Sequence, residues 1–174
     1  MTGRMPIAGQ QAVTFESTLE RDFALVTQFQ KGFRSLEEQP VRIPIPAPGR
    51  SYIPDFLVNW ADPREADLVE VKHLADLEAD KDRLTIKFAA AEKFARTRGW
   101  RFIVATERDI RTPLLANAKF LLPFRNRAVD PGLCARLLDC LNGSGVMAAG
   151  QLLETAFPHA LWRPSASALT WRHR

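Results

Sequence analysis

The feature that most constrains the fold is the segment 52–72, YIPDFLVNWADPREADLVEVK, in which two apolar, strand-like runs flank a short polar loop. Side chains two residues apart on a strand point to the same face, so Glu70 and Lys72 project together while the valines beside them enter a core. If the first run is the neighbouring strand of a hairpin, it carries Asp55 alongside them. Pro54 cannot donate a hydrogen bond to a sheet, which suits a strand start or a bulge. The segment predicts two carboxylates and an ammonium group on one face of a hairpin.

This group of charges points to metal-dependent phosphodiester chemistry. Two carboxylates on one sheet face are unfavourable unless a cation binds them, and Mg²⁺ prefers oxygen ligands, commonly one or two carboxylates with waters and substrate phosphate. Lys72 would then orient or deprotonate a water, or neutralise charge on a phosphate. An E-x-K pair also occurs on ordinary solvated strand faces, so the motif requires support from the rest of the chain.

The composition is that of a soluble globular protein with one main domain. The chain has 174 residues, of which 46% are hydrophobic and 25% charged, and this balance supports a sizeable core. The net charge of +4 is compatible with nucleic acid as a partner. Cys134 and Cys140 indicate reduced thiols in a predicted helix, not a disulfide framework. We expect a cytoplasmic protein without a membrane partner, because no apolar run approaches ~18 residues and the N-terminus lacks a signal-peptide core.

The first part of the chain is predicted to hold one helix. Residues 1–13 are small and polar, and we expect a frayed tail there. Apolar residues then recur at helical spacing, and Ser17 with Glu20 forms an S-x-x-E capping box that starts the helix. Glu20 therefore has two interpretations, as a capping residue and as a further acid facing the active site. Glu16 competes for either role.

The rest of the domain is predicted to continue as an edge strand, the hairpin, a helix and a further strand. Residues 41–46 alternate as a strand that two prolines restrict to a sheet edge, and Pro48-Gly49 predicts a turn. After the hairpin, apolar positions over 81–98 predict a long helix that Gly99 ends. Residues 100–106 predict a buried strand, and the strand–helix–strand path indicates a parallel crossover.

The C-terminal region, residues 129–174, differs from the domain predicted over 14–128. It predicts two short helices separated by a break at 142–145, followed by a small hairpin or wing over 158–174. Two interpretations stay open for this region. It is either part of a winged-helix unit or a helical appendage packed on the sheet of the main domain.

The order of elements resembles that of a known nuclease superfamily. A helix with a leading glutamate, a strand with Asp, an E-x-K strand, a long helix and a strand follow one another as in restriction-endonuclease-like proteins of the PD-(D/E)xK class. The runs S-T-L-E-R-D-F-A-L, Y-I-P-D-F-L-V, L-V-E-V-K and G-W-R-F-I-V-A-T-E-R-D-I together resemble TnsA-like endonucleases over roughly residues 14–125. The resemblance implies an α/β fold, with a restriction-endonuclease-like core of a mixed central sheet flanked by helices and a small, mainly helical C-terminal appendage.

The resemblance also implies an active site and its partners. Glu20 would be the first acid, Asp55 would bridge the metals, Glu70 would be the second acid, and Lys72 would be the catalytic lysine. Relatives bind two Mg²⁺ or Mn²⁺ ions, an arrangement that clamps the attacking and leaving oxygens. They cut the 5′ strands of DNA at transposon ends, while a TnsB-like transposase cuts the 3′ strands and a TnsC-like ATPase regulates both.

Several further residues carry two interpretations each. Gln39, in E-Q-P, lies either near the site or simply at a sheet edge as a structural amide. His73 either touches a metal or phosphate, or is a surface histidine at a strand end. Lys81, Arg83 and Lys87 either contact DNA or form a solvated helix face.

The functional context also stays open at this level. The chain is a transposase subunit, a nuclease of the same fold from a phage or another mobile element, or a module that bridges DNA and transposase without cutting. Full-length TnsA has a larger winged-helix domain that contacts the ATPase. Because the region after residue 125 is shorter than that domain, contact with a TnsC-like ATPase stays open.

Overall fold

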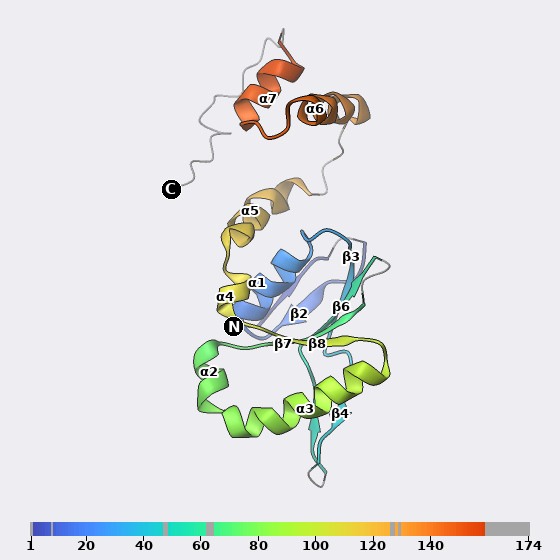
Figure 1. Ribbon diagram of the computed structural model, residues 1–174, viewed down its shortest axis with the longest axis vertical. Helices are drawn as coiled ribbons and strands as arrows, with labels where there is room; N and C mark the ends of the chain where they lie inside the picture. The colour runs from blue at the N-terminus through green and yellow to red at the C-terminus, as the bar shows by residue number, and fades with distance from the viewer. Residues whose placement is uncertain are drawn as a thin grey trace. The chain divides into compact units, whose positions relative to one another are not determined.

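Two compact units make up the protein, residues 1–126 and residues 127–174, among the parts of the chain that the structure describes. The computed structural model (Figure 1) describes residues 2–7, 9–46, 49–61, 65–125, 128 and 130–158. Within these ranges no helix is long and apolar enough to cross a membrane.

A mixed sheet forms the centre of the first unit. In the described ranges it has four strands in the order β3-β6-β7-β8, with β8 parallel to β7 and the other pairs antiparallel. The strands are β3 (Phe33–Glu38), β6 (Phe56–Trp60), β7 (Asp67–Val71) and β8 (Arg101–Ala105). The path from β7 to β8 runs through α2 (Leu74–Ala79) and the long α3 (Lys81–Thr97). The predicted hairpin, long helix and parallel crossover are thereby confirmed.

The first helix, α1 (Thr18–Thr27), begins where the capping box predicts. The Ser17 hydroxyl accepts a hydrogen bond from the Glu20 amide at 3.1 Å. The Glu20 carboxylate reaches back to accept from the Glu16 amide at 2.8 Å, one residue before the N-cap position of a standard capping box. The capping interpretation of Glu20 is confirmed.

The N-terminal tail is not frayed, so the expectation for residues 1–13 was wrong. β1 (Gly3–Met5) pairs antiparallel with β2 (Val13–Phe15), and both strands bury their apolar side chains against the main core. Gly3 leaves room for the ring of Phe15, because a Cβ at this position would lie 2.5 Å from it. Strands of only three residues each, Gly-Arg-Met and Val-Thr-Phe, give too little periodicity to be recognised in the sequence.

Two more strands differ from expectation. β3 occupies the polar stretch before Gln39, where only a connection was expected; it is largely exposed apart from Leu36, so it lacks strand-like alternation. The edge strand predicted over 41–46 shrinks to β4 (Ile43–Pro44), which pairs with β5 (Ser51–Tyr52) in a separate small sheet. Pro48 of the predicted turn lies outside the described residues.

The residues of β7 enter two different cores. Val69 and Val71 pack into a core that includes side chains of α1, while Leu68 packs into another core with Ala91 and Ala95 of α3. Glu70 follows the parity of Leu68 and is itself buried, because α3 and the β4–β5 sheet cover that face. The β8 strand is less buried than predicted, since it lies at the edge of the described sheet and has half-buried central residues.

After β8 the chain returns to the side of α1. α4 (Glu107–Ile110), α5 (Pro113–Leu121) and a 3₁₀ turn, η1 (Leu122–Phe124), follow, and they contribute Ile110, Leu115 and Ala118 to the core that contains α1. The apolar run AKFLLPF before residue 125 is therefore helical.

The second unit contains two packed helices in its described part. α6 (Pro131–Ser144) continues through the residues where a break was expected and ends at Gly145, which has a φ of +71°. α7 (Ala149–Ala156) follows, and the guanidinium of Arg136 lies 5.1 Å from the ring centroid of Phe157. Cys134 and Cys140 are free and half-buried. The hairpin or wing expected near the C-terminus lies almost entirely outside the described residues.

Candidate active site

Two carboxylates meet where β6 begins and β7 ends. Phe56 pairs with Val69, so Asp55 and Glu70 occupy the next position of the same antiparallel register. The Asp55 Oδ2 accepts a hydrogen bond of 2.7 Å from the Val71 amide, which ties this side chain to β7. The hairpin therefore brings together the two acids that the sequence predicted to be neighbours.

Glu70 is held from two sides. It is only 6% exposed, and its Oε2 accepts a hydrogen bond of 2.7 Å from the Tyr52 hydroxyl. On the other side its Oε1 lies 3.7 Å from the Nζ of Lys72. Lys87 of α3 stands nearby, with its Nζ 5.7 Å from the centroid of the Tyr52 ring. Glu70 and Lys72 thus project together, as the strand alternation predicts.

The two carboxylates resist being charged at the same time. Burial raises the pKa of Asp55 to about 7, and the nearby charges of Glu70 and Glu20 act in the same direction, against the hydrogen bond from Val71. Burial also raises the pKa of Glu70, against the opposing effects of the Tyr52 hydroxyl and the Lys72 ammonium group. Raised pKa values of this kind are typical of carboxylates at functional sites. A structural carboxylate usually has a positively charged or hydrogen-bonding partner within the protein that favours its charged form.

Glu20 reaches the same region from α1. It lines a cavity of about 200 Å³ together with Asp55 and Gln39, and the full lining is Thr14, Glu16, Glu20, Glu38, Gln39, Asp55 and Phe56. The charge of Glu20 contributes to the raised pKa of both Asp55 and Glu70. Glu20 therefore caps its helix and also lines a cavity with Asp55, and its role as an active-site acid stays a prediction.

Gln39 is both a sheet-edge residue and a neighbour of the site. Its amide donates to the Asp55 carbonyl at 2.8 Å, and its side chain donates to the Glu16 carboxylate at 3.4 Å. Its φ of +43° lies in the left-handed region that a residue with a side chain rarely adopts. Backbone strain of this kind is found preferentially at functional sites.

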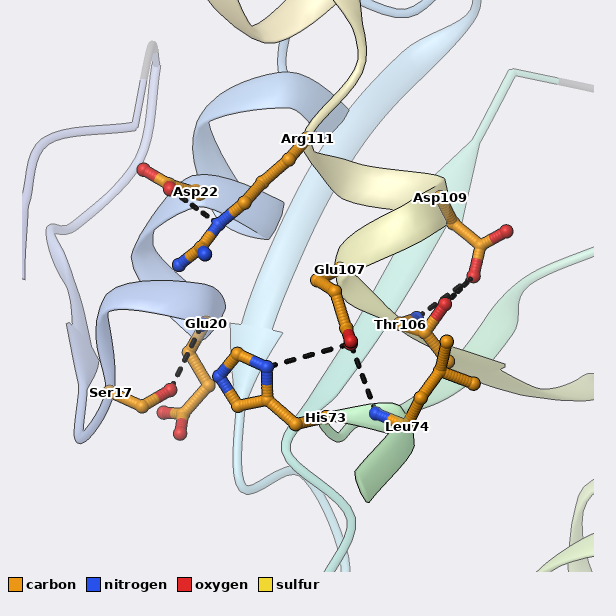
Figure 2. Close-up of polar contacts among 9 residues, drawn as sticks. All are labelled: Ser17, Glu20, Asp22, His73, Leu74, Thr106, Glu107, Asp109 and Arg111. Atoms are coloured by element: carbon orange, nitrogen blue, oxygen red, sulfur yellow. Dashed lines mark hydrogen bonds and ion pairs between the residues drawn. The ribbon is translucent and has the colours of Figure 1, made fainter. Parts of the chain in front are cut away.

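His73 turns toward a carboxylate on α4. Its Nδ1 lies 3.5 Å from the Glu107 Oε2, which also accepts a hydrogen bond of 3.0 Å from the Leu74 amide. Figure 2 shows these contacts and also draws Glu20 on the first turn of α1. Hydrogen bonds from backbone amides, its own and that of Leu74, lower the pKa of Glu107. The structure therefore gives His73 a protein partner at the strand end.

The three basic residues of α3 are in different surroundings. Lys81 and Arg83 are exposed in the first turn, and Arg83 forms an ion pair with Asp80. Lys87, one turn further, is half-buried above Tyr52 and favours the charged form of Glu70. Of these three residues, only Lys87 is tied to the carboxylate pair.

The donor set suits a hard divalent cation. Asp55 and Glu70 offer oxygen atoms only, and two carboxylates completed by water and phosphate oxygens are a usual set for Mg²⁺. A cation between them would compensate for the burial that raises the pKa of both carboxyls and for the negative charge of Glu70 that adds to the raised pKa of Asp55. Within the described ranges, no three or more His, Cys, Asp or Glu side chains are arranged around one point as a metal site. Glu20 therefore lines the shared cavity without joining the pair as a third ligand in this conformation.

Tyr52 is the site residue that the sequence analysis missed. It belongs to β5, outside the sheet that carries Glu70, and no periodicity or motif links the two positions. The one available signal was the sequence context, since Tyr52 opens the run that leads to Asp55. Such proximity in sequence does not predict a hydrogen bond between side chains.

The fold and the site together define a class of protein. A mixed sheet whose antiparallel hairpin presents an acid and an E-x-K strand, followed by a helical crossover, is consistent with an endonuclease-like fold. The sequence model of one family, described as TnsA-like endonuclease N terminal, matches residues 33–107. This match confirms the resemblance to TnsA-like endonucleases over the stretch from β3 to the start of α4.

The match covers only part of the predicted site. It includes Asp55, Glu70 and Lys72, whereas Glu20 lies before it and the second unit lies after it. No curated protein matches the chain closely enough to count as a relative.

Proposed function

We propose that this protein is a divalent-cation-dependent DNA endonuclease, the subunit of a heteromeric cut-and-paste transposase that cleaves the 5′ strands. One observation carries the proposal. The segment that matches the TnsA-like endonuclease family holds Asp55 and Glu70 in neighbouring register positions, with the Lys72 ammonium group beside Glu70.

Asp55 and Glu70 would hold the cation, Mg²⁺ or Mn²⁺, and Glu20 on the shared cavity is the acid available for a second ion. When bound, the cation would supply charge stabilisation to the phosphate and lower the pKa of a water. The hydrogen bonds that Asp55 and Glu70 accept from Val71 and Tyr52 keep their carboxylates oriented. Orientation of this kind lowers the reorganisation needed during the reaction.

Lys72 supplies a positive charge beside the reacting groups. Its ammonium group, close to Glu70, orients the attacking water and offsets negative charge on the phosphate. The water oxygen forms a bond to phosphorus as the bond to the 3′ oxygen breaks, leaving a 5′ phosphate and a 3′ hydroxyl. The water loses one proton and the 3′ oxygen gains one.

Basic residues of α3 extend the site toward DNA. Lys81 and Arg83 are exposed on the first turn, where their charges would contact phosphates by simple electrostatic attraction. The DNA would be the end of a mobile element, with a TnsB-like transposase as partner and a TnsC-like ATPase as regulator. The family match supports DNA as substrate and a Tn7-type transposase as partner in general, and the TnsB-like and TnsC-like proteins are our proposal for the specific partners.

The test is cleavage of labelled supercoiled and branched DNA by the full chain, with Mg²⁺ or Mn²⁺. Wild type is compared with Asp55→Ala and Lys72→Ala, and Lys93→Ala serves as a control on an exposed position of α3. We expect nicking by wild type and the control, and none by the two site variants.

If wild type is inactive alone, the assay is repeated with a TnsB-like transposase from the same mobile element. DNA binding without cleavage under both conditions would overturn the nuclease and favour a bridging module. Cleavage that needs no transposase and is unaffected by one would favour a nuclease of a phage or another mobile element.

A further inference from the structure

Tyr52 connects the carboxylate pair to a different part of the fold. It lies in the small β4–β5 sheet, is 4% exposed, and donates its hydroxyl proton to the Glu70 Oε2 at 2.7 Å. Its ring packs with Leu57, Leu68 and Ala91 in the core between the sheet and α3. The ring is therefore fixed by packing, and its hydroxyl points at one particular carboxylate oxygen.

Lys87 stands on the other side of that ring. Its Nζ lies 5.7 Å from the ring centroid, within the range of a cation–π interaction, and its side chain is half-buried. Its positive charge favours the ionised form of Glu70. Lys87 therefore stabilises both the position of the tyrosine and the charge of the carboxylate.

These contacts assign the two oxygens of Glu70 to different tasks. Oε2 is occupied by the Tyr52 hydroxyl, while Oε1 lies 3.7 Å from the Lys72 Nζ, a distance longer than a normal hydrogen bond. Burial and the neighbouring charge of Glu70 raise the pKa of Tyr52, so the phenol keeps its proton and stays a donor. Oε1 is thus the oxygen available to a ligand.

We propose that Tyr52 and Lys87 are positioning residues that orient Glu70 for a divalent cation. The inference rests on the proposed nuclease function and extends it to residues outside the E-x-K strand. Tyr52 acts through its hydrogen bond and Lys87 through its cation–π contact with the Tyr52 ring, and neither has to touch the DNA.

The substitution Tyr52→Phe isolates the hydrogen bond, because it removes the hydroxyl and keeps the packed ring. Binding of Mn²⁺ to the full chain, measured by the paramagnetic resonance signal of the free ion, gives a readout that does not depend on cleavage. We expect Tyr52→Phe to weaken Mn²⁺ binding about tenfold or more, as for the loss of a hydrogen bond to a charged group. In nicking assays we expect kcat to fall while KM for DNA is unchanged.

Lys87→Met tests the charge, with Lys93→Met as the matched control on the same helix. We expect roughly threefold weaker Mn²⁺ binding for the first variant, as for the loss of a cation–π contact that holds the Tyr52 ring, and no change for the second. Lys87→Arg should restore most of the affinity because it retains the positive charge. Thermal unfolding of every variant identifies any that fail to fold. If Tyr52→Phe fails to fold, the test rests on Lys87→Met.

A double-substitution comparison separates positioning from general stability. In a Glu70→Ala background, Tyr52→Phe should have no further effect on Mn²⁺ binding, since its target is gone. Equal weakening with and without Glu70, or wild-type affinity in the folded Tyr52→Phe variant, would overturn the inference and leave the proposed function intact. If wild type binds Mn²⁺ no better than Asp55→Ala, the metal-dependent function fails, and the inference fails with it.

Discussion

Two buried acids on the same strand have opposite environments. Asp67, at the start of β7, is 2% exposed, and its carboxylate accepts hydrogen bonds of 2.9 and 2.6 Å from Arg101 and of 2.7 Å from the Trp60 indole. Glu70, three residues later, has one short hydrogen bond from Tyr52, a more distant Lys72, and the Asp55 carboxylate as a neighbour.

The difference shows how a single strand can carry both a structural acid and the acid that we propose to bind a cation. Residues 67 and 70 have opposite parity, so Asp67 follows Val69 toward the core that contains α1, while Glu70 follows Leu68 toward α3. On the first face the Arg101 guanidinium donates two hydrogen bonds to Oδ1 of Asp67 and the Trp60 indole donates one to Oδ2, so both carboxylate oxygens have partners within the protein. On the second face Asp55 and Glu70 both lie close to Lys72, and Glu70 also lies close to Lys87. The negative charge that these lysines leave unbalanced is available to a bound cation.

The largest expected effect is the loss of cleavage at the functional end of the strand. Asp55→Asn keeps an acceptor for the Val71 amide but removes the charge, and we expect the nicking rate to fall at least ~100-fold. Asp67→Asn should leave the rate per folded molecule within about twofold, a range too small to reflect a lost catalytic group. Single-turnover nicking with labelled DNA measures both. A comparable loss of nicking rate in the two variants would contradict the assignment of Asp67 as a purely structural acid.

Asp67 should dominate stability instead. Asp67→Ala removes the hydrogen bonds to Arg101 and Trp60, and we expect the free energy of unfolding to fall by ~1–3 kcal/mol. Glu70→Gln retains an acceptor for the Tyr52 hydroxyl and should cost less than ~1 kcal/mol. Urea unfolding followed by tryptophan fluorescence compares the two variants. A larger loss for Glu70→Gln would mean that Glu70 is the structural acid.

The pH dependence of stability should sharpen the comparison. The pKa of Asp55 is raised from 3.8 to about 7 in the folded protein, so between these values the folded state holds a proton that the unfolded state has released. The free energy of unfolding therefore falls as pH rises through this window, by ~1–3 kcal/mol.

Melting temperatures in a chelating buffer between about pH 5 and pH 8 measure this slope. Asp55→Asn should remove most of it, because the group that releases the proton is gone. Asp67→Asn serves as the control and should keep the slope. A wild-type melting temperature that rises across this range would contradict the raised pKa.

The smallest effect concerns the strained residue beside the site. Among the described residues Gln39 is the one non-glycine with positive φ, and its amide holds the Asp55 carbonyl at the functional end of the hairpin. Gln39→Gly should raise the free energy of unfolding by ~0.5–1 kcal/mol, since glycine adopts this conformation without strain. Thermal unfolding measures the gain, and Gln39→Ala, which keeps the strain, should show none.

The sequence predicted the elements in which apolar residues recur at a regular spacing. The hairpin, the long helix with Leu84, Ala91 and Ala95 buried, and the helix start at Ser17 all follow from local rules of spacing and capping. β1, β2 and β3 were missed, because very short or exposed strands have no clear alternation and form only when a partner strand is present.

By itself, then, the sequence determined which acids lie together. Strand alternation and a short hairpin loop place Glu70, Lys72 and Asp55 within reach of one another, since these relations are local. The tertiary structure alone decided how each acid is charged and held. The Tyr52 hydroxyl, Lys87 and Arg101 come from a second sheet, a helix and the crossover strand. Burial and partners distant in sequence set the pKa of a carboxylate, and neither can be predicted from the spacing of neighbouring residues.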